Sequence, residues 1–337
     1  MRPRPRRSLV VSLSLVLATL ARSRASACDV CAVYMATEQR EGQTGFHLGV
    51  AEQYTHFGTE LQDGAEVTLP ADERMDSAIT QFFLGYRFTP RIGLQLVVPY
   101  VVRSFRRIHD HRIQTGTENG IGDLSLLGTF RVLSLVTDRS TLQVGVVAGV
   151  KFPSGDPSRL GEELDTAAPA ASPRHATHEA PAANGLPAEG GLHGHDLALG
   201  SGSYDGIVGG QLFWSRDRLF ATAGGQYAVR STGAFDYRYA NDLTWVGGPG
   251  WFALLTHEYT LGVQLLVSGE TKGKDTQQGV KADDTAMTAL YLGPGFSVTW
   301  GTSLAADLAV DVPVLQHDTA LQLVPDVRLR GGLTWRF

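Results

Sequence analysis

The sequence predicts an all-β protein, a transmembrane antiparallel up-and-down β-barrel of about 12 strands. Three observations lead to this prediction: apolar and polar residues alternate, the N-terminus is typical of an exported protein, and long and short connections alternate. The alternation is clearest near the C-terminus, where apolar residues occupy most odd positions from Leu321 to Phe337 and the even positions include three arginines, Arg328, Arg330 and Arg336. Alternate side chains of a strand point to opposite faces, so one face is apolar and the other cationic. Lipid on one side and a wet lumen on the other require that pattern.

Residues 1–27 are predicted to be a signal peptide. Arginines crowd the first seven residues, and the apolar run over residues 9–20 has the length of a signal-peptide core but is too short to span a bilayer as a helix. Small residues at positions 25–27 suit cleavage, which makes Cys28 the first mature residue. A second interpretation, in which Cys28 is acylated as in a lipoprotein, stays open.

The alternation recurs along the whole mature chain. About twelve segments show it, and they begin near Phe46, Ala78, Ile92, Ile121, Leu142, Tyr204, Leu219, Thr244, Tyr259, Thr288, Leu304 and Leu321. An even number brings the C-terminus back to the side of the N-terminus. Every second connection is short, and barrels have short periplasmic turns and long extracellular loops, so both ends are expected to be periplasmic. We therefore expect residues 44–337 to form the barrel and residues 28–43 to form a periplasmic segment that carries a cysteine pair.

Three of the longer connections are expected to be extracellular loops. They cover residues 57–76, 103–119 and 153–203. The last is rich in Ala, Pro, Gly and Glu and lacks the apolar content to fold alone, so we expect a long, mobile extracellular loop.

Composition excludes two classes of protein. No apolar stretch approaches the roughly 20 residues of a membrane helix. The formal net charge is −5, and removing residues 1–27, which contain six Arg and no acid, leaves −11. An acidic exported chain is a poor nucleic-acid binder. The expected location is the bacterial outer membrane, and the expected partners are membrane lipid and lipopolysaccharide, the barrel assembly machinery and a small-molecule solute, with no nucleic acid.

Charged residues on the polar faces are the candidates for the lumen. The predicted lumen and transport residues are Arg87, Asp123, Arg131, Lys151, Asp205, Arg230, Asp307, Asp311, Arg328 and Arg330. One interpretation is that these charges pair with one another as packing. The other is an anion-selective ladder of cations.

Three short motifs resemble a known family. They read Gly-Ile-Gly-Asp at residues 120–123, Lys-Phe-Pro-Ser-Gly at residues 151–155 and Leu-Gly-Ser-Gly-Ser-Tyr-Asp at residues 199–205. This series resembles the signature of the outer-membrane barrels named for the meta-pathway of phenol degradation, over roughly residues 78–337. The resemblance implies a twelve-stranded barrel that moves small, often aromatic or apolar, compounds across the outer membrane, without catalytic residues. The long insertion between the second and third motifs and the Cys-x-x-Cys start depart from the family pattern.

Cysteines and histidines raise a metal-binding alternative. Cys28 and Cys31 have the spacing of half a zinc site, of a redox pair or of a small disulfide loop. Six histidines stand in close pairs within the expected outer loops: His109, His111, His175, His178, His193 and His195. Imidazole suits zinc and copper, which are the candidate ions; otherwise no cofactor is expected.

We expect a passive channel or facilitator for a small, apolar or aromatic solute, and not an enzyme. The alternative function is transition-metal binding for uptake or efflux. A hydrolase is the least favoured class, because the chain has no Gly-x-Ser-x-Gly motif and His56 lacks a serine at the spacing that outer-membrane lipases use.

Overall fold

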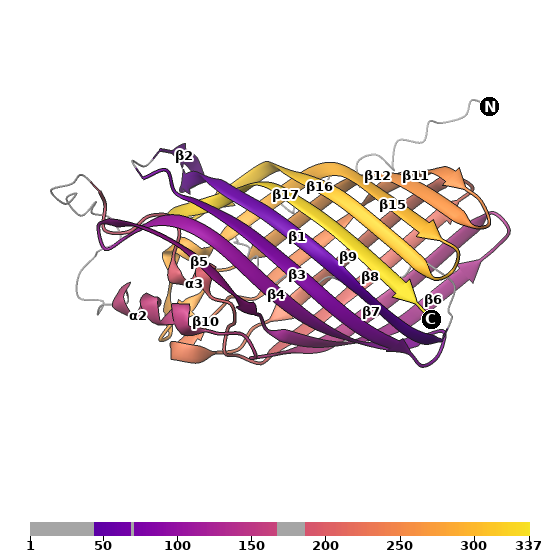
Figure 1. Cartoon of the computed structure of the whole chain (residues 1–337), viewed down its shortest axis with the longest axis horizontal. Helices are drawn as coiled ribbons and strands as arrows, with labels where there is room; N and C mark the ends of the chain where they lie inside the picture. The colour runs from indigo at the N-terminus through magenta and orange to yellow at the C-terminus, as the bar shows by residue number, and fades with distance from the viewer. Residues whose placement is uncertain (1–43, 69–70, 167–185) are drawn as a thin grey trace, which may run out of the picture.

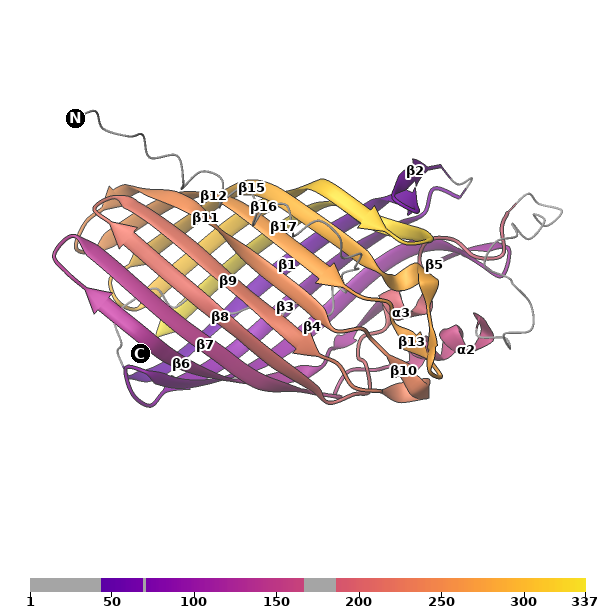
Figure 2. The same ribbon diagram turned by 180° about the vertical axis from the view of Figure 1, so that it is seen from behind.

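A computed structural model describes residues 44–68, 71–166 and 186–337 (Figures 1 and 2). Within these residues, twelve long antiparallel strands close into a barrel, which confirms the predicted fold class and strand number. In chain order these strands are β1 (Gly45–Gln62), β3 (Arg74–Arg87), β4 (Ile92–His109), β6 (Leu124–Val136), β7 (Ser140–Phe152), β8 (Asp205–Arg216), β9 (Leu219–Val229), β11 (Asp242–Leu255), β12 (Tyr259–Lys272), β15 (Met287–Trp300), β16 (Leu304–Asp318) and β17 (Leu321–Arg336).

Shorter elements lie in the connections at one end of the barrel. They are β2 (Ala65–Val67), β5 (Arg112–Ile121), η2 (Ser158–Glu162), α2 (Glu163–Thr166), α3 (Gly194–Leu197), η3 (Ala234–Asp236), β10 (Tyr237–Arg238), β13 (Thr276–Gln277), β14 (Val280–Lys281) and η4 (Asp283–Thr285). Figure 1 shows β2, β5, β10, α2 and α3 at the end opposite the C-terminus. No helix among the described residues is long and apolar enough to cross a membrane.

The last strand closes the barrel against the first. β17 pairs with β1 from Arg336 opposite His47 to Leu321 opposite Gln62. The terminal residue continues this pairing, because Phe337 and Phe46 exchange two backbone hydrogen bonds of 3.1 Å. Closure leaves no strand edge in the barrel wall, as a membrane-spanning sheet requires.

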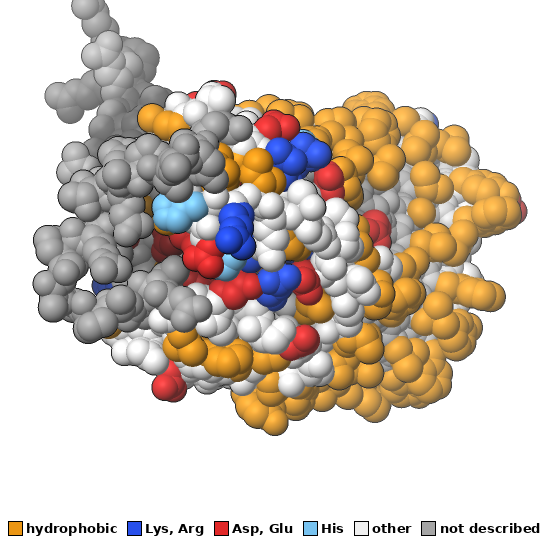
Figure 3. Space-filling model, turned by 60° about the vertical axis from the view of Figure 1, so that its left-hand side comes forward, with side chains coloured by type: hydrophobic (Ala, Val, Ile, Leu, Met, Phe, Trp, Pro, Cys, Tyr) orange, Lys and Arg blue, Asp and Glu red, His pale blue; other side chains and the backbone are white. Residues whose placement is uncertain are grey.

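Outward-facing side chains form an apolar belt around the barrel. On β3 the outward Phe82 is 53% exposed, whereas the inward Phe83 is 3% exposed. Aromatic rings gather at the end of the belt near the C-terminus, where Phe46 lies 4.6 Å from Tyr86 and 6.3 Å from Phe337 between ring centroids. Figure 3 shows hydrophobic side chains over the strands and charged side chains on the end of the barrel that faces the viewer. This belt with flanking aromatics is the outer surface of a membrane barrel.

The connections also follow the expected order. Five tight turns lie at the end that carries the C-terminus, and the longer connections lie at the other end, except for the two-residue link between β16 and β17. Two of the expected outer loops are instead largely strand: β1 runs on to Gln62, and β4 and β5 form a tall hairpin whose tip is at Asp110 and His111. The prediction failed there because the outward positions of these stretches are polar, as at Ser104 and Arg106 on β4, so the apolar outer face that marks a membrane strand is missing. The period-two signal then disappears while backbone pairing continues.

Residues 153–166 and 186–203, called the insert below, enter the barrel end instead of forming a solvated loop. In the described parts, residues 153–166 and 186–203, the side chains of Leu160, Leu192 and Leu197 are almost completely buried. Leu192 and Leu197 pack against inward residues of four strands: Phe57, Met75, Phe105 and Leu323. The expectation of a solvated loop is therefore wrong for these parts. A few leucines suffice because they complete the core of the barrel end rather than build one of their own.

Candidate functional site

The three sequence motifs meet where the insert joins the barrel. Asp123, just before β6, accepts hydrogen bonds from the backbone N–H of Gly155 (3.0 Å) and from the backbone N–H (2.9 Å) and hydroxyl (2.8 Å) of Ser201. Nearby, the Ser154 hydroxyl donates to the carbonyl of Gly122 (2.9 Å). Both ends of the insert are therefore tied to one carboxylate.

A network of paired charges surrounds Asp123. The Lys151 ammonium lies 2.5 Å from Asp123 and 2.9 Å from Asp205. Arg230 then bridges Asp205 (3.0 Å) and Asp242 (2.6 Å). All five side chains are buried. Four of them are predicted lumen residues that the fold brings together; Asp242 was missed, although a charge at an inward position on a strand start was a usable signal.

Two arginines of β4 hold the other face of the insert. Arg103 donates to the carbonyls of Asp196 (2.6 Å) and Ala198 (2.9 Å), and Arg107 bonds the carboxylate of Glu162 (2.8 Å). Both arginines are 1% exposed. They were missed because this part of β4 was assigned to an outer loop. Their spacing of four residues, which keeps the inward alternation of β4, was the available signal.

The two central arginines of β17 are paired inside the lumen. Arg328 bonds Glu270 (3.1 Å), and its guanidinium lies 4.6 Å from the ring centre of Tyr291. Arg330 makes two bonds to Asp311, at 2.7 and 3.0 Å. These contacts support the packing interpretation over an anion-selective ladder for this pair of arginines. Glu270 was missed by the sequence prediction.

Arginines also face one another near the C-terminal end of the barrel. Arg87 and Arg131 line a small recess together with Arg91. The charges of Arg87, Arg131 and Arg336 lie close enough to repel one another. The cationic face predicted for the last strand therefore meets two further predicted lumen cations at this end.

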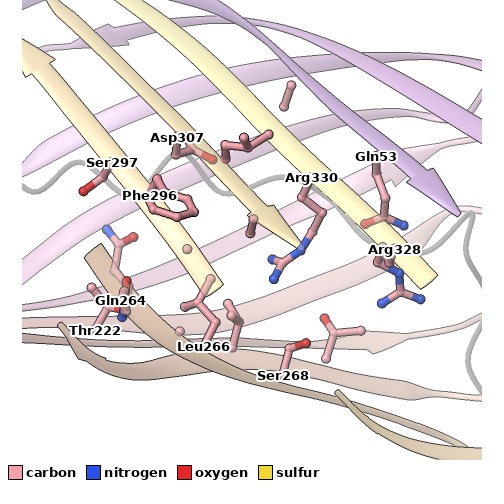
Figure 4. A pocket seen from close by; sticks show the side chains of 18 of the residues that line it. Gln53, Thr222, Gln264, Leu266, Ser268, Phe296, Ser297, Asp307, Arg328 and Arg330 are labelled. Atoms are coloured by element: carbon pink, nitrogen blue, oxygen red, sulfur yellow. The ribbon is translucent and has the colours of Figure 1, made fainter. Parts of the chain in front are cut away.

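A cavity of about 290 Å³ occupies the lumen (Figure 4). Its wall is rich in neutral polar side chains, among them Gln53, Gln81, Gln211, Gln226, Gln264, Thr222 and Ser268. Ile79 and Leu266 add apolar surface, and Asp307, Arg328 and Arg330 also reach it. In Figure 4 the side chains of Arg330, Gln53 and Ser268 point toward the space between β12 and β17. Small-molecule sites begin at about 300 Å³, so this volume suits a small solute.

An apolar layer fills part of the lumen beside this cavity. It consists of one inward side chain from each of β1, β3, β4, β6, β7 and β8, namely Ala51, Phe83, Val97, Leu127, Val147 and Ile207. The cavity lies mostly against the opposite wall, from β9 to β17, and is also bordered by Gln53, Gln81 and Gln211 of β1, β3 and β8.

That opposite wall contains an irregular seam between β11 and β12. The register passes from Gly247 opposite Val267 to Gly250 opposite Gln264 and leaves Gly248 and Pro249 without partners on β12. Proline cannot donate to the ladder. The Gln264 amide compensates by donating to the carbonyl of Gly248 (2.8 Å).

The seam lies between two hollows. On the outer face, Pro249, Trp251, Leu265 and Pro294 help to line a shallow groove of about 560 Å³. Gln264 lines both this groove and the lumen cavity. Gln264 and the interrupted ladder therefore lie between the lumen cavity and the outer groove.

The predicted histidine pairs lie in different surroundings. The rings of His193 and His195 stack 5.6 Å apart inside the insert, and His195 bonds Glu163 (2.9 Å). His109 contacts Glu189 (3.2 Å), and His111 contacts the carbonyl of Leu186 (3.1 Å). His193 and His195 therefore lie in the buried part of the insert, whereas His109 and His111 lie at the tip of the β4–β5 hairpin.

Metal binding stays a hypothesis. Within the described ranges, no three side chains of His, Cys, Asp or Glu are grouped as metal ligands. Cys28, Cys31, His175 and His178 lie outside the described residues.

Neighbouring carboxylates set the protonation state of the stacked histidines. Burial alone would lower the pKa of His195, but Asp196 and Glu163 outweigh it and raise that pKa to about 10. Burial alone would raise the pKa of Glu163, but the charge and hydrogen bond of His195 lower it to about 2. Burial also opposes the charge on His193, yet Asp284 raises its pKa. A buried charged cluster therefore holds the insert together at neutral pH.

The barrel is similar to solved outer-membrane proteins. No family model and no curated protein matches the chain. An outer membrane channel from Pseudomonas putida F1 superimposes with a TM-score of 0.59 at 14% identity, over 90% of this chain and 100% of that one. The β domain of the Bordetella autotransporter BrkA gives 0.41 at 9% identity, over 88% and 100%, and the CymD monoaromatic hydrocarbon channel gives 0.37 at 9% identity, over 88% and 89%.

The similarity to the Pseudomonas channel shows the fold. With the closed barrel and its apolar belt, it defines this protein as a bacterial outer-membrane β-barrel. The resemblance to the phenol meta-pathway barrels is not confirmed by these comparisons.

Proposed function

We propose that the protein is an outer-membrane channel that conveys small solutes through its lumen. The observation that carries this proposal is the cavity of about 290 Å³ inside the barrel. Ile79 in its wall also packs against Leu199 of the insert. A barrel that served only as an anchor would gain nothing from such a space, because empty volume forfeits packing contacts. The name of the Pseudomonas protein, an outer membrane channel, agrees with this function.

The insert is proposed to be the closure of the channel on the extracellular side. It packs among inward residues of β1, β3, β4 and β17 and is tied at both ends to Asp123. Conduction along the axis then requires part of the insert to leave its buried position. The polar network around Asp123 makes undocking of the insert all-or-none rather than gradual, because the loss of one hydrogen bond or ion pair weakens the others.

The seam is proposed to be a side passage for apolar solutes. Pro249 and Gly248 interrupt the ladder at the point where the cavity and the outer groove share Gln264. A solute that partitions into lipid can leave there without crossing the polar lumen end. This path suits the small, apolar or aromatic compounds that the family resemblance implies.

No catalytic role is proposed. His56, the histidine considered for hydrolysis, bonds Asp76 (2.8 Å) on the outer face of β1 and β3, where it is partly exposed. The carboxylates beside the lumen cavity, such as Asp311 and Glu270, are engaged by arginines.

The test is conduction by wild type and by Asp123→Asn in planar bilayers. The substitution keeps the shape of the side chain but removes the charge that holds Lys151 and Ser201. We expect rare conductance steps for the wild type and frequent ones for Asp123→Asn. The matched control is Asp138→Asn, at an exposed aspartate in the turn between β6 and β7. Silence of all three folded proteins, together with no solute flux into liposomes, would contradict a channel.

A further inference from the structure

A ring of inward side chains lies between the apolar layer of the lumen and the tight turns. On each of the six strands that build the layer, the ring residue is four positions from the layer residue, as Arg87 is from Phe83, so it also faces the lumen. The ring consists of His47, Arg87, Gly93, Arg131, Gln143 and Gln211. None of them is acidic, and the arginines and glutamines carry N–H donors. Hydrogen-bond donors therefore follow the apolar layer on this side of the lumen.

The arginines and glutamines of the ring line one recess of about 20 Å³, together with Arg91 and Phe213. A space of this size takes one small polar group. A glycine provides the room: Gly145 lies opposite Arg131, and a Cβ at this glycine would lie 3.2 Å from Nε2 of Gln211. The amide of Gln211 therefore lies over Gly145, among the side chains that line the recess.

Positive charge gathers around this recess. Arg87 lies close enough to Arg131 and Arg336 for their charges to repel one another. Arg336 is opposite His47 in the pairing of β17 with β1, which places it beside the ring. No described residue in the lining of the recess is acidic, and Asp307 belongs to the wall of the larger lumen cavity. Like charges gathered in a space with low-dielectric walls attract a small anion.

Apolar surface adjoins the recess. Phe213 in its lining is 8% exposed and lies beside Phe220, with 6.4 Å between the ring centroids. Gln211 lines both the recess and the lumen cavity, so the two spaces are neighbours. A solute whose charged group enters the recess can therefore place its apolar part against Phe213 or in the neighbouring cavity.

We propose that Arg87, Arg131 and the two glutamines of the ring form a binding site for the carboxylate group of a small organic acid. A planar guanidinium bonds two carboxylate oxygens at once, which favours a carboxylate over a spherical anion such as chloride. The glutamine amides donate to the same oxygens, and the apolar part of the acid packs against Phe213. This inference rests on the proposed function and names the class of solute that the lumen favours.

The test compares two molecules of nearly the same shape, cyclohexanecarboxylate and the neutral cyclohexanecarboxamide. Binding to the full mature protein in nanodiscs of zwitterionic lipid is measured by saturation-transfer NMR at about pH 7.5, where the acid is ionised. Empty nanodiscs give the background. We expect the carboxylate to bind wild type at least about tenfold more tightly than the amide, because hydrogen bonds to charged groups are the stronger ones.

Substitutions assign this preference to the ring. Arg131→Gln keeps N–H donors but removes the charge, and Arg87→Gln does the same from another strand, so each should lower the preference severalfold. The matched control is Arg139→Gln, which removes an exposed charge from the turn between β6 and β7 at the same end of the barrel. It should preserve the wild-type ratio. Heat-shifted electrophoretic mobility shows that each variant is folded.

Displacement distinguishes a carboxylate site from a site for any anion. Sodium acetate should displace bound cyclohexanecarboxylate from wild type at a lower concentration than sodium chloride does, because only acetate matches the guanidinium fork. Displacement by chloride at the lower concentration would overturn the carboxylate assignment.

Equal affinity of wild type for the acid and the amide would overturn the site itself. Equal loss of preference in Arg131→Gln, Arg87→Gln and Arg139→Gln would do the same, because it would make the preference a general effect of charge at this end. Binding in nanodiscs requires no passage across a membrane. A protein that binds the carboxylate but shows no conduction or flux would therefore keep the site and lose the channel function.

Discussion

Asp123 at the start of β6 holds Ser201 at the far end of the insert, through hydrogen bonds from both the backbone N–H (2.9 Å) and the hydroxyl (2.8 Å) of the serine. These residues are separated by 78 positions in the chain. The contact turns a long connection between two strands into part of the barrel interior. The predictions below follow from that arrangement and from the seam in the wall.

Replacing Asp123 by Ala should release the insert without unfolding the barrel. Removing one partner of a buried ion pair costs about 3–5 kcal/mol, and here Lys151 and the ends of the insert lose their common acceptor. We expect trypsin cleavage after Arg159, in η2, to become at least about tenfold faster while the heat-shifted band persists. Mass spectrometry of the fragments measures this, and Asp138→Ala is the control. Unchanged cleavage in the folded variant would show that the network does not hold the insert.

Docking of the insert should depend on pH through His195 and Glu163. The pKa of His195 is raised from 6.5 to about 10, so its contribution is complete below pH 6.5 and is lost as the pH rises toward 10. The pKa of Glu163 is lowered from 4.5 to about 2, so its contribution is complete above pH 4.5 and is lost as the pH falls toward 2. Docking should therefore be strongest between pH 4.5 and 6.5.

Hydrogen exchange of residues 186–203 measures this dependence, after correction for intrinsic exchange rates. Protection should decrease from about pH 6 to about pH 9.5 in wild type. In Glu163→Gln the decrease should be smaller, because one of the carboxylates that raise the pKa of His195 is gone. An identical decrease in the variant would exclude this pair as its source.

A disulfide across the seam should block the side passage. Trp251 and Val263 are paired outward-facing positions on β11 and β12, next to the interrupted ladder. In cells that express the double cysteine variant, uptake of N-phenylnaphthylamine should fall toward that of cells without the protein under oxidising conditions and recover with a reductant. The matched control joins Val208 to Tyr227, paired outward positions across the regular β8–β9 seam. Equal effects of both disulfides, or no effect of either, would argue against a passage at Gly248 and Pro249.

Substitutions of Arg330 and of Asp311, which form one ion pair, should shift the ion selectivity of the channel in opposite directions. Arg330→Ala leaves the Asp311 carboxylate without its guanidinium and should shift the open channel toward cations, whereas Asp311→Asn should shift it toward anions. Reversal potentials under a salt gradient, measured in the Asp123→Asn background, give the shift. If both substitutions move the potential the same way, the pair does not border the conducting path.

The strand number and the closure of this barrel could be predicted from the chain alone. Lipid imposes a period of two on the outer face, so Phe82 and Leu84 signal their strand without any knowledge of their neighbours. The same local rule identified Arg328, Arg330 and Asp311 as inward-facing. It could not pair them, because pairing depends on the register between strands.

The tertiary structure alone decided what lies inside the barrel. Arg230 meets Asp205 across 25 positions and Asp242 across 12, and Arg103 reaches the insert across more than 90. No local sequence pattern specifies which partners, so far apart in the chain, will meet. The insert illustrates the same limit, since its leucines are too few to form a core and become buried only because the barrel supplies the other half. Lipid contact requires apolar residues at alternate positions within each strand, so the strands can be recognised from the local sequence. The lumen depends on contacts between residues far apart in the chain, which form only when the strands have closed into the barrel.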